Sequence, residues 1–366
     1  MHVLFLILDG LAPRQVRSEV MPTLTAMAEE GGWNRTGGLA VMPASTYPNH
    51  ATFVTGVVPA VHGLWSSKVP RPTDDGAAPL VDAWEVGPSS ATLFERCAAA
   101  GRSSAAVLGD QHLVGAMGAG GADHVWPAGG VLGEEVARDA FEYADDAATA
   151  QEIARAVARG PDLVVAQLNG PDTAAHLYGP DSEEALEAYR YNDAAIGVVR
   201  RSVAARWEEW VVLVVSDHGQ EEAGAEFIDL GAEMRNRGIG GRAILDGSAA
   251  VVTGEGGRDP KWLGELPAVQ GWEPAGDAVV AWGRAGSCFG EHRWGIPGIH
   301  GSPRTRGQVA VVSGGHPAAA RVADAVGSAP PPATAWAGTV AELLGITSGR
   351  GRRSRGGPGP GPGPGR

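Results

Sequence analysis

Aspartate and histidine side chains recur in this sequence where apolar, strand-like runs end. Asp9 follows the run at residues 3–8, and Asp217 and His218 follow the run at residues 210–215. Ligands of open α/β sheets bind at the carboxyl ends of the strands, so these side chains are expected to meet at one edge of a sheet. Taken singly, Asp9 could instead cap a helix or a turn.

Two later segments add the same residue types. The run at residues 163–168 leads into NGPDTAAHLYGP, where Asp172 and His176 stand four positions apart and would share one face of a helical turn. His300 lies in GIHGSP. Three carboxylates and three imidazoles suit borderline metals such as Zn²⁺, and six ligands are too many for one tetrahedral ion. The set therefore predicts two metal ions. In such sites the ions lie about 4 Å apart and stabilise the attacking and leaving oxygens of an in-line displacement.

A candidate nucleophile lies in the segment PASTYPNHATFVTGVVPAVHG. Thr46 comes just before Pro48, and proline favours the first turn of a helix. A hydroxyl at that place would face the positive end of the helix dipole. Coordination to a metal would supply the activation that a free hydroxyl lacks. Thr46 is therefore predicted to be the nucleophile.

The elements that must position these side chains alternate along the chain. Short β-rich runs alternate with helical ones, which predicts a sheet covered by helices on both faces. Strands are expected at residues 3–8, 103–108, 163–168, 210–215 and 309–312, and helices at 21–30, 91–100, 147–158, 182–206 and 335–344. One catalytic domain is expected over residues 1–347, with a cap-like insertion at about 227–298, and the Gly/Pro/Arg tail 348–366 is expected to be disordered.

Composition excludes several partners. The formal net charge of −13 opposes an electrostatically held nucleic acid polymer, although bound metal ions would still allow a phosphate substrate. The two cysteines, Cys97 and Cys288, form neither a disulfide framework nor a Cys-rich metal site. The apolar run at 3–8 has no basic residue before it and is shorter than a secretory core. No stretch approaches the roughly 20 apolar residues that span a bilayer, so we expect no membrane association and a cytoplasmic protein.

As a set, these motifs resemble those of a known family. LDG, STYPNHATFVTG with PAVHG, PDTAAHLYGP, SDHG and IHG are similar, in the same order, to the type I phosphodiesterase/nucleotide pyrophosphatase family of the alkaline phosphatase superfamily. The resemblance spans residues 3–313 and implies a three-layer α/β/α sandwich with a largely parallel central sheet. It also implies a hydrolase that cleaves phosphodiester or pyrophosphate bonds of small, phosphorylated, nucleotide-type substrates.

The resemblance also implies a role for each motif residue. Two zinc ions are expected, one held by Asp172, His176 and His300, and the other by Asp9, Asp217 and His218 with the Thr46 oxygen. Thr46 would attack phosphorus to form a phospho-threonine, which a zinc-bound hydroxide would then hydrolyse. The two in-line steps would retain configuration at phosphorus. Asn49 and His50 are expected to support the site rather than bind metal, and His112 matches no motif.

One position departs from the family. Members usually carry an asparagine about 21 residues after the nucleophile, and Ser67 stands there beside Lys68. A hydroxyl can donate one hydrogen bond, and an ammonium would supply charge that favours a phosphomonoester dianion. Ser67 and Lys68 are therefore included in the predicted catalytic set.

Other functions remain open at this point. A sulfatase needs a Cys or Ser nucleophile in a C/S-x-P-x-R pattern, which Thr46 and Asn49 exclude. A phosphomonoesterase or a phosphonoacetate-hydrolase-like enzyme could share the metal cage. A catalytically silent metal-binding scaffold is the alternative of another class, although none of the seven ligand and nucleophile positions is lost.

Overall fold

The computed structural model describes residues 1–70, 79–290 and 295–346. The predicted tail, residues 348–366, lies outside the described residues.

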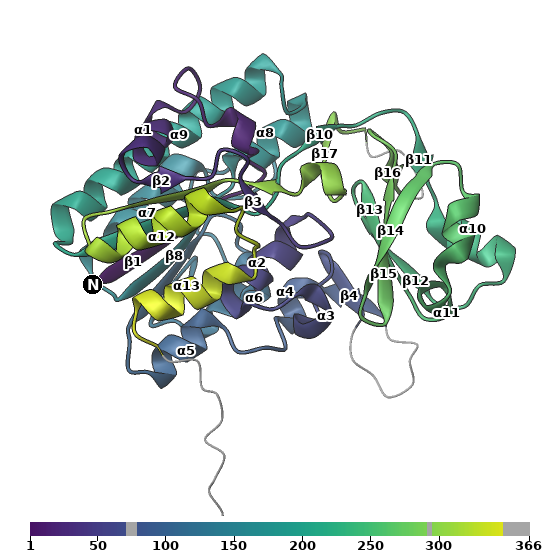
Figure 1. The fold of residues 1–366 in the computed structure, drawn as a ribbon, viewed down its shortest axis with the longest axis horizontal. Helices are drawn as coiled ribbons and strands as arrows, with labels where there is room; N and C mark the ends of the chain where they lie inside the picture. The colour runs from purple at the N-terminus through teal and green to yellow at the C-terminus, as the bar shows by residue number, and fades with distance from the viewer. Residues whose placement is uncertain (71–78, 291–294, 347–366) are drawn as a thin grey trace, which may run out of the picture.

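A seven-stranded sheet forms the centre of the larger part of the molecule, in the order β2-β19-β9-β1-β8-β6-β7 (Figure 1). β9, β1, β8, β6 and β7 run parallel, and β19 runs antiparallel to both of its neighbours. The strands are β1 (His2–Leu8), β2 (Gly32–Trp33), β6 (Ser104–Leu108), β7 (His124–Trp126), β8 (Leu163–Leu168), β9 (Trp210–Ser216) and β19 (Ala310–Gly314). The predicted α/β class with a largely parallel sheet is confirmed.

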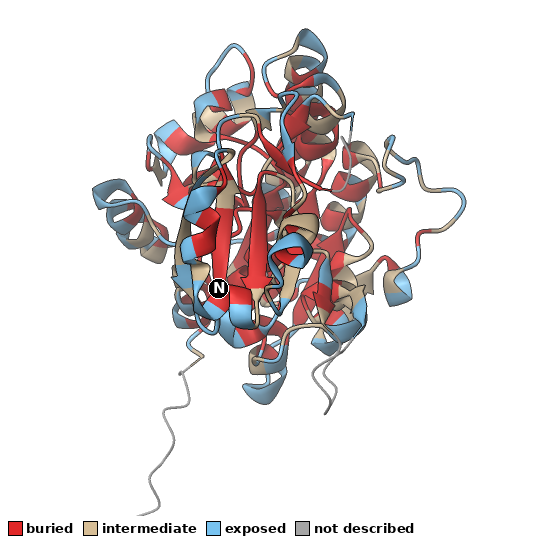
Figure 2. Cartoon of the chain, turned by 90° about the vertical axis from the view of Figure 1, so that its right-hand side faces the viewer, coloured by how far each residue is buried: buried red, intermediate tan, exposed pale blue. Residues whose placement is uncertain are grey.

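Helices cover both faces of this sheet, which explains why its central strands are apolar without alternation. In β1, Phe5 packs with one helical layer and Leu6 with the other. The first layer contains α2 (Thr46–Thr55), α5 (Leu93–Ala99), α12 (Pro317–Ser328) and α13 (Ala335–Leu343). The second contains α1 (Pro22–Glu30), α7 (Asp146–Ala158) and α9 (Glu183–Arg206). Figure 2 shows the central strands buried and the outer helices exposed on their solvent side.

The segment predicted as a cap forms a second, antiparallel sheet of four strands, seen at the right of Figure 1. Its strands are β12 (Arg242–Asp246), β13 (Ala249–Thr253), β14 (Val269–Ala275) and β15 (Ala278–Gly283), with α10 (Leu230–Arg237) and α11 (Glu255–Arg258) beside them. One face builds a core of its own around Val252 and Phe289. The other face packs Val251 and Val280 against Ala44, in the segment that leads into α2. The cap sheet therefore contacts the start of the predicted nucleophile helix.

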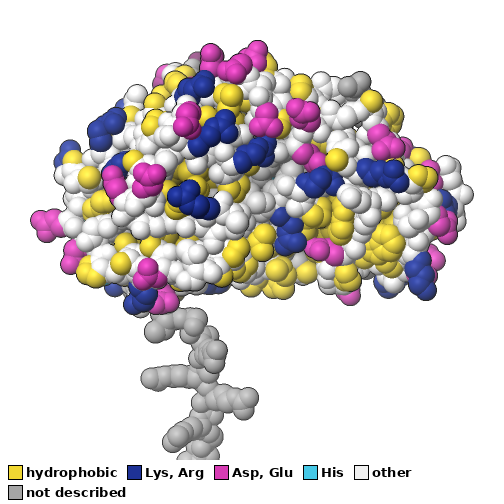
Figure 3. All heavy atoms as spheres, turned by 45° about the horizontal axis from the view of Figure 1, so that its top comes forward, with side chains coloured by type: hydrophobic (Ala, Val, Ile, Leu, Met, Phe, Trp, Pro, Cys, Tyr) yellow, Lys and Arg dark blue, Asp and Glu magenta, His cyan; other side chains and the backbone are white. Residues whose placement is uncertain are grey.

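Two shorter features complete the frame of the site. α8 (Gly170–Tyr178) follows β8, and β17 (Gly298–Ile299) pairs with β10 (Glu221–Glu222), so both lie beside the carboxyl ends of the parallel strands. Acidic and basic side chains are interspersed on the face shown in Figure 3, without a broad basic patch. Within the described residues, no helix has both the length and the apolar character needed to cross a bilayer.

Candidate active site

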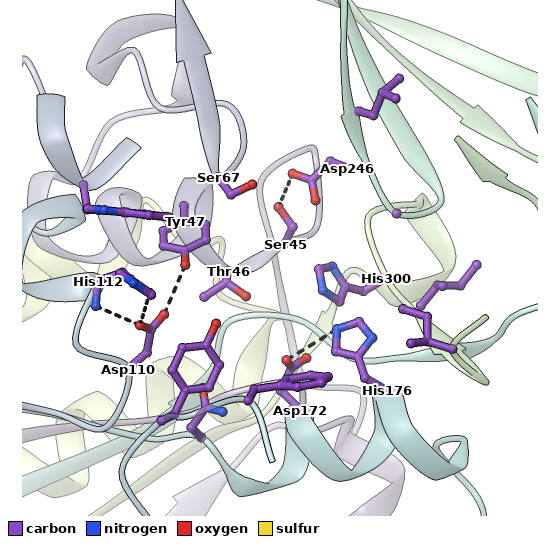
Figure 4. A pocket seen from close by; sticks show the side chains of 18 of the residues that line it. Ser45, Thr46, Tyr47, Ser67, Asp110, His112, Asp172, His176, Asp246 and His300 are labelled. Atoms are coloured by element: carbon purple, nitrogen blue, oxygen red, sulfur yellow. Dashed lines mark hydrogen bonds and ion pairs between the residues drawn. The ribbon is translucent and has the colours of Figure 1, made fainter. Parts of the chain in front are cut away.

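The carboxyl edge of the central sheet brings the predicted side chains together. Asp9 follows β1, and Asp217 and His218 follow β9. The remaining members are Asp172 and His176 on α8, His300 just after β17, and Thr46 as the first residue of α2. The helix and loop members reach the same edge because α2, α8 and the β17 loop converge there. Figure 4 shows Thr46, Asp172, His176 and His300 around one cavity.

Asp9, Asp217 and His218 form the first candidate metal-binding group. Each offers one ligand atom, and these atoms lie within 4.8 Å of one another. His218 Nε2 is 3.7 Å from Asp9 Oδ1 and 3.2 Å from Asp217 Oδ2. The Thr46 hydroxyl oxygen lies 3.5 Å from Asp9 Oδ1 and 3.3 Å from His218 Nε2. The predicted nucleophile is therefore adjacent to this group.

The second group differs in one member from the predicted set. Asp172, His218 and His300 bring their ligand atoms within 4.8 Å, so His218 contributes to both groups. The His218 and His300 rings stack with centroids 4.0 Å apart. His176 lies at the edge of this group, with its Nε2 atom 3.5 Å from Asp172 Oδ2.

Backbone carbonyls orient two of these imidazoles. His218 Nδ1 lies 3.0 Å from the oxygen of Gly219, and His176 Nδ1 lies 2.8 Å from the oxygen of Gly298. A protonated Nδ1 that donates to each carbonyl leaves the Nε2 lone pair facing the carboxylates. This arrangement is typical of histidines that bind metal through Nε2.

Two glutamines hold the carboxylates. Gln167 Nε2 donates to Asp9 Oδ2 at 2.9 Å, and Gln220 Nε2 donates to Asp172 Oδ1 at 2.6 Å. Each carboxylate keeps its second oxygen for another partner. The amides therefore fix the carboxylate planes without adding charge.

The pKa values of the buried carboxyls and imidazoles are consistent with a site for a cation. Burial raises the pKa of Asp9 well above its ordinary value, and the nearby charges of Asp217 and Asp172 raise it further. Burial likewise raises the pKa of Asp217 to about 8 and lowers the pKa of His218 to about 3. Neutral imidazoles offer free lone pairs to a divalent metal, and a bound cation would displace the protons that these buried carboxyls keep in its absence. Asp217 Oδ2 and His300 Nδ1 are also buried without a hydrogen-bond partner, so the donor set fits metal binding.

The start of α2 presents Thr46 to the cavity. Ser45, the residue before the helix, is extended, and its side chain makes no capping hydrogen bond to the helix. Asn49 Nδ2 donates to the backbone carbonyl oxygen of Ser45 at 2.9 Å, and His50 Nδ1 lies 2.9 Å from the backbone carbonyl oxygen of Thr46. His50 Nδ1 also lies 3.4 Å from Asp217 Oδ2, so it supports both the nucleophile helix and a candidate ligand.

Ser67 and Lys68 have different surroundings. Ser67 lines the cavity, whose volume is about 490 Å³, and faces the region above Thr46 (Figure 4). Lys68 does not line it. Its side chain is 53% exposed and its ammonium forms an ion pair with Asp82. The structure therefore brings Ser67, but not Lys68, to the predicted site.

Sequence reasoning missed a second polar cluster in the same cavity. Asp110 accepts a hydrogen bond from the Tyr47 hydroxyl at 3.3 Å and lies 3.0 Å from His112 Nδ1 (Figure 4). The His112 ring stacks on Trp84 with centroids 4.1 Å apart. Asp110 closely follows the strand β6, so the same strand-end rule that selected Asp9 could have found it.

Asp246 was also missed. It lies at the end of β12 in the cap and lines the cavity, where its Oδ2 accepts a hydrogen bond from the Ser45 hydroxyl at 2.6 Å. No local sequence signal marks it, since it lies in a hairpin of another sheet.

Comparison with known proteins identifies the family. Residues 3–239 match the family model described as type I phosphodiesterase / nucleotide pyrophosphatase. Venom phosphodiesterase CdcPDE of Crotalus durissus collilineatus is 24% identical over 202 residues, which cover 52% of this chain and 22% of that protein. Human ectonucleotide pyrophosphatase/phosphodiesterase family member 1 is 22% identical over 229 residues, covering 59% and 23%. The matched region thus spans less than a quarter of these curated relatives.

Solved structures show the same fold. Murine ectonucleotide pyrophosphatase / phosphodiesterase 5 aligns with a TM-score of 0.69 and 17% identity, over 95% of this chain and 96% of that one. An inactive threonine-to-alanine form of the murine protein, in complex with AMP, gives a TM-score of 0.68 at 16% identity over 95% and 96%. Phosphonoacetate hydrolase from Sinorhizobium meliloti 1021, in complex with phosphonoacetate, gives 0.66 at 16% identity over 94% and 95%.

The family model covers well over half of the chain, and the fold and the strand-end Asp/His groups agree with it. The chain belongs to the type I phosphodiesterase/nucleotide pyrophosphatase family, within the alkaline phosphatase superfamily.

Proposed function

We propose that this chain hydrolyses phosphodiester or pyrophosphate bonds of nucleotide-type substrates, with Thr46 as nucleophile at a site for two zinc ions. The observation that carries the proposal is the place of the Thr46 hydroxyl. It lies at the start of α2, in the wall of a cavity of about 490 Å³, and 3.3–3.5 Å from atoms of Asp9 and His218. A hydroxyl so placed can be activated by bound metal and can reach a phosphorus atom in the cavity.

The metal ligands in this proposal are the six Asp and His side chains. One ion would be held by Asp9, Asp217 and His218 with the Thr46 oxygen, and the other by Asp172, His176 and His300. The compact group of Asp172, His218 and His300 makes His218 a further candidate for the second ion. Bound zinc would supply positive charge that lowers the pKa of the Thr46 hydroxyl and offsets the charge on the phosphoryl oxygens.

In this proposal, hydrolysis proceeds by two successive displacements at phosphorus. The Thr46 oxygen attacks phosphorus, the bond from phosphorus to the leaving-group oxygen breaks, and a phospho-threonine results. Water attacks the same phosphorus atom, the bond to the Thr46 oxygen breaks, and phosphate or a phosphate ester is released. The Ser67 hydroxyl, in the cavity wall, is placed to donate a hydrogen bond to a phosphoryl oxygen in both steps.

The nucleotide part of the proposal has two supports. A protein of the same fold has been solved in complex with AMP. In this chain the rings of Tyr47, Trp84 and Tyr143 line the cavity, and aromatic side chains of this kind can stack on a planar base.

A set of Thr46 variants tests the mechanism. Thr46→Ala should lower kcat for bis(p-nitrophenyl) phosphate by several orders of magnitude while zinc content is retained, because the six Asp and His ligands remain. Thr46→Ser keeps a hydroxyl and should retain part of the rate. Acid quenching of the wild type during turnover, followed by mass spectrometry, should show phosphate on Thr46.

The substrate panel separates the alternatives. It should contain a diester, a nucleoside triphosphate, a monoester and phosphonoacetate. Faster turnover of the monoester or of phosphonoacetate would replace the proposed substrate class. Zinc binding without hydrolysis of any of them would make the chain a silent scaffold. Near-normal activity of Thr46→Ala would exclude the covalent mechanism.

A further inference from the structure

The hydroxyl of Ser45 makes an unusual contact for its position. Ser45 is the residue before α2, with extended backbone angles, and serine there ordinarily accepts a hydrogen bond from a first-turn N–H of the helix. Here it makes no such bond. Its hydroxyl instead donates to Asp246 Oδ2 at 2.6 Å (Figure 4). The cap therefore holds this side chain away from the helix that carries Thr46.

The consequence is that the start of α2 keeps its N–H groups free. Pro48, in the first turn, has no N–H, so the first-turn donors are those of Thr46 and Tyr47. Within the described part of the chain, neither of these N–H groups donates a hydrogen bond. Both belong to residues that line the cavity. A phosphoryl oxygen beside Thr46 would thus meet unpaired donors at the positive end of the helix.

Contacts other than the one with Ser45 hold Asp246 in place. The backbone N–H of Ser248, in the same hairpin turn, donates to the His300 oxygen at 2.7 Å. The backbone oxygen of Leu245, the residue before Asp246, accepts a hydrogen bond from the Ser66 hydroxyl at 3.2 Å. Gly247 in the turn has φ +58, and an added Cβ would lie 2.4 Å from the His300 oxygen, so the turn is packed tightly on that loop. The position of the carboxylate is therefore set by the cap hairpin.

We infer that Asp246 is a positioning residue for phosphoryl transfer: it keeps the Ser45 hydroxyl off the first turn of α2, so that the Thr46 and Tyr47 N–H groups stay available to the phosphoryl oxygens. The inference rests on the proposed function, because it assumes that Thr46 attacks phosphorus. It assigns the cap a part in the reaction itself, through one carboxylate.

A positioning role of Asp246 predicts an effect that a merely structural role would not. In Asp246→Ala the Ser45 hydroxyl loses its acceptor and is free to rotate onto the Tyr47 N–H as an ordinary helix cap. This would place an oxygen where a phosphoryl oxygen must bind. The value of kcat/KM for bis(p-nitrophenyl) phosphate should fall by at least about tenfold, since loss of one such donor typically costs about 10²–10³ in kcat. Asp246→Asn keeps an oxygen acceptor for Ser45 and should lose less.

The decisive variant removes both side chains. Ser45→Ala with Asp246→Ala has no hydroxyl to cap the helix, so its kcat/KM should be higher than that of Asp246→Ala alone. Ser45→Ala alone should lose less than Asp246→Ala. Asp229→Ala is the matched control, because Asp229 is a cap carboxylate that accepts a hydrogen bond from Ala232 N at the start of α10, away from the cavity. It should leave kcat/KM unchanged.

The outcomes separate the inference from the proposed function. Recovery of activity in the double variant supports the positioning role. A double variant as slow as Asp246→Ala, or slower, overturns it while the Thr46 mechanism stands. If Thr46→Ala remains active, the proposed function fails first, whatever the Asp246 variants do. Comparable melting temperatures for the zinc-loaded variants would show that the activities compare folded proteins.

Discussion

Asp217→Asn should have opposite effects on the metal-free and the zinc-loaded protein. The Asp217 side chain is fully buried, its Oδ1 accepts hydrogen bonds from the N–H groups of Gly10 at 3.0 Å and His218 at 2.9 Å, and its Oδ2 has no hydrogen-bond partner. An asparagine could keep both accepted bonds through its oxygen. Its amide nitrogen would then replace Oδ2, 3.2 Å from His218 Nε2, and could donate to that lone pair. Without metal, the substitution therefore removes a buried carboxyl that resists ionisation and replaces its unpartnered oxygen with a nitrogen that can donate a hydrogen bond.

The pKa of Asp217 gives the size and the direction of the effect. Burial raises this pKa to about 8 from an ordinary value near 3.8. Between about pH 4 and pH 8 the unfolded chain carries the charge while the folded, metal-free protein keeps the proton, so stability falls as pH rises. One pKa unit corresponds to about 1.4 kcal/mol, which sets a ceiling of about 6 kcal/mol. Relaxation around a buried charge lowers this, and we expect Asp217→Asn to stabilise the metal-free protein at pH 8 by about 2–4 kcal/mol.

Thermal unfolding with a chelator and with zinc provides the assay. For a chain of 366 residues, the expected stabilisation corresponds to a rise in Tm of about 3–5 °C without metal. The gain should shrink at pH 5, where the folded carboxyl is already protonated. With zinc the order should reverse, because the wild type gains about 4.1 kcal/mol when free zinc is about 1,000 times its Kd and the variant lacks a charged ligand. A metal-free variant less stable than the wild type at pH 8 would refute the reasoning, as would an equal response of both proteins to zinc.

Three further predictions concern the other residues of the site. Elemental analysis should find about two zinc ions per wild-type chain, and His300→Ala should bind about one fewer, because its half-buried ring belongs to one of the two candidate groups; a wild type with less than one ion would contradict this. Ser67→Asn should raise the ratio of diester to monoester kcat/KM, since it restores an amide donor in the cavity wall, and an unchanged ratio would remove Ser67 from substrate selection. Lys68→Ala should change kcat/KM for both substrates by less than about twofold, because its ammonium pairs with Asp82 outside the cavity lining. A loss confined to the monoester would show that Lys68 reaches the substrate after all.

Much of the central fold could be read from local patterns. The strand predicted at residues 3–8 is observed as His2–Leu8, and the helix predicted at 182–206 as Glu183–Arg206. Both are strong patterns, an unbroken apolar run in one case and a long helical periodicity with a serine cap in the other. The short edge strands β2 and β7 were missed, because two or three residues at a sheet edge carry too little periodicity to stand out.

The sequence by itself determined the family and named the Asp and His residues of the candidate metal-binding groups. Asp9, Asp217 and His218 could be assigned because a parallel sheet delivers the residues after its strands to one edge, and strand ends are visible in the sequence. Their order along the chain also carries the family resemblance. These are properties of short segments and of segment order, which tertiary packing does not alter.

Only the tertiary structure decided which candidate ligands lie together and which side chains surround Thr46. It groups His218 with His300, and it pairs Lys68 with Asp82. It also brings Asp246 to Ser45 across 201 positions of sequence. The contact of Asp246 with Ser45 arises where the cap sheet packs against the segment before α2, and side chains that meet through packing of separate sheets leave no periodic trace along the chain. The candidate ligands that follow strands could therefore be predicted from the sequence, whereas the surroundings of Thr46 depend on the docking of a second sheet.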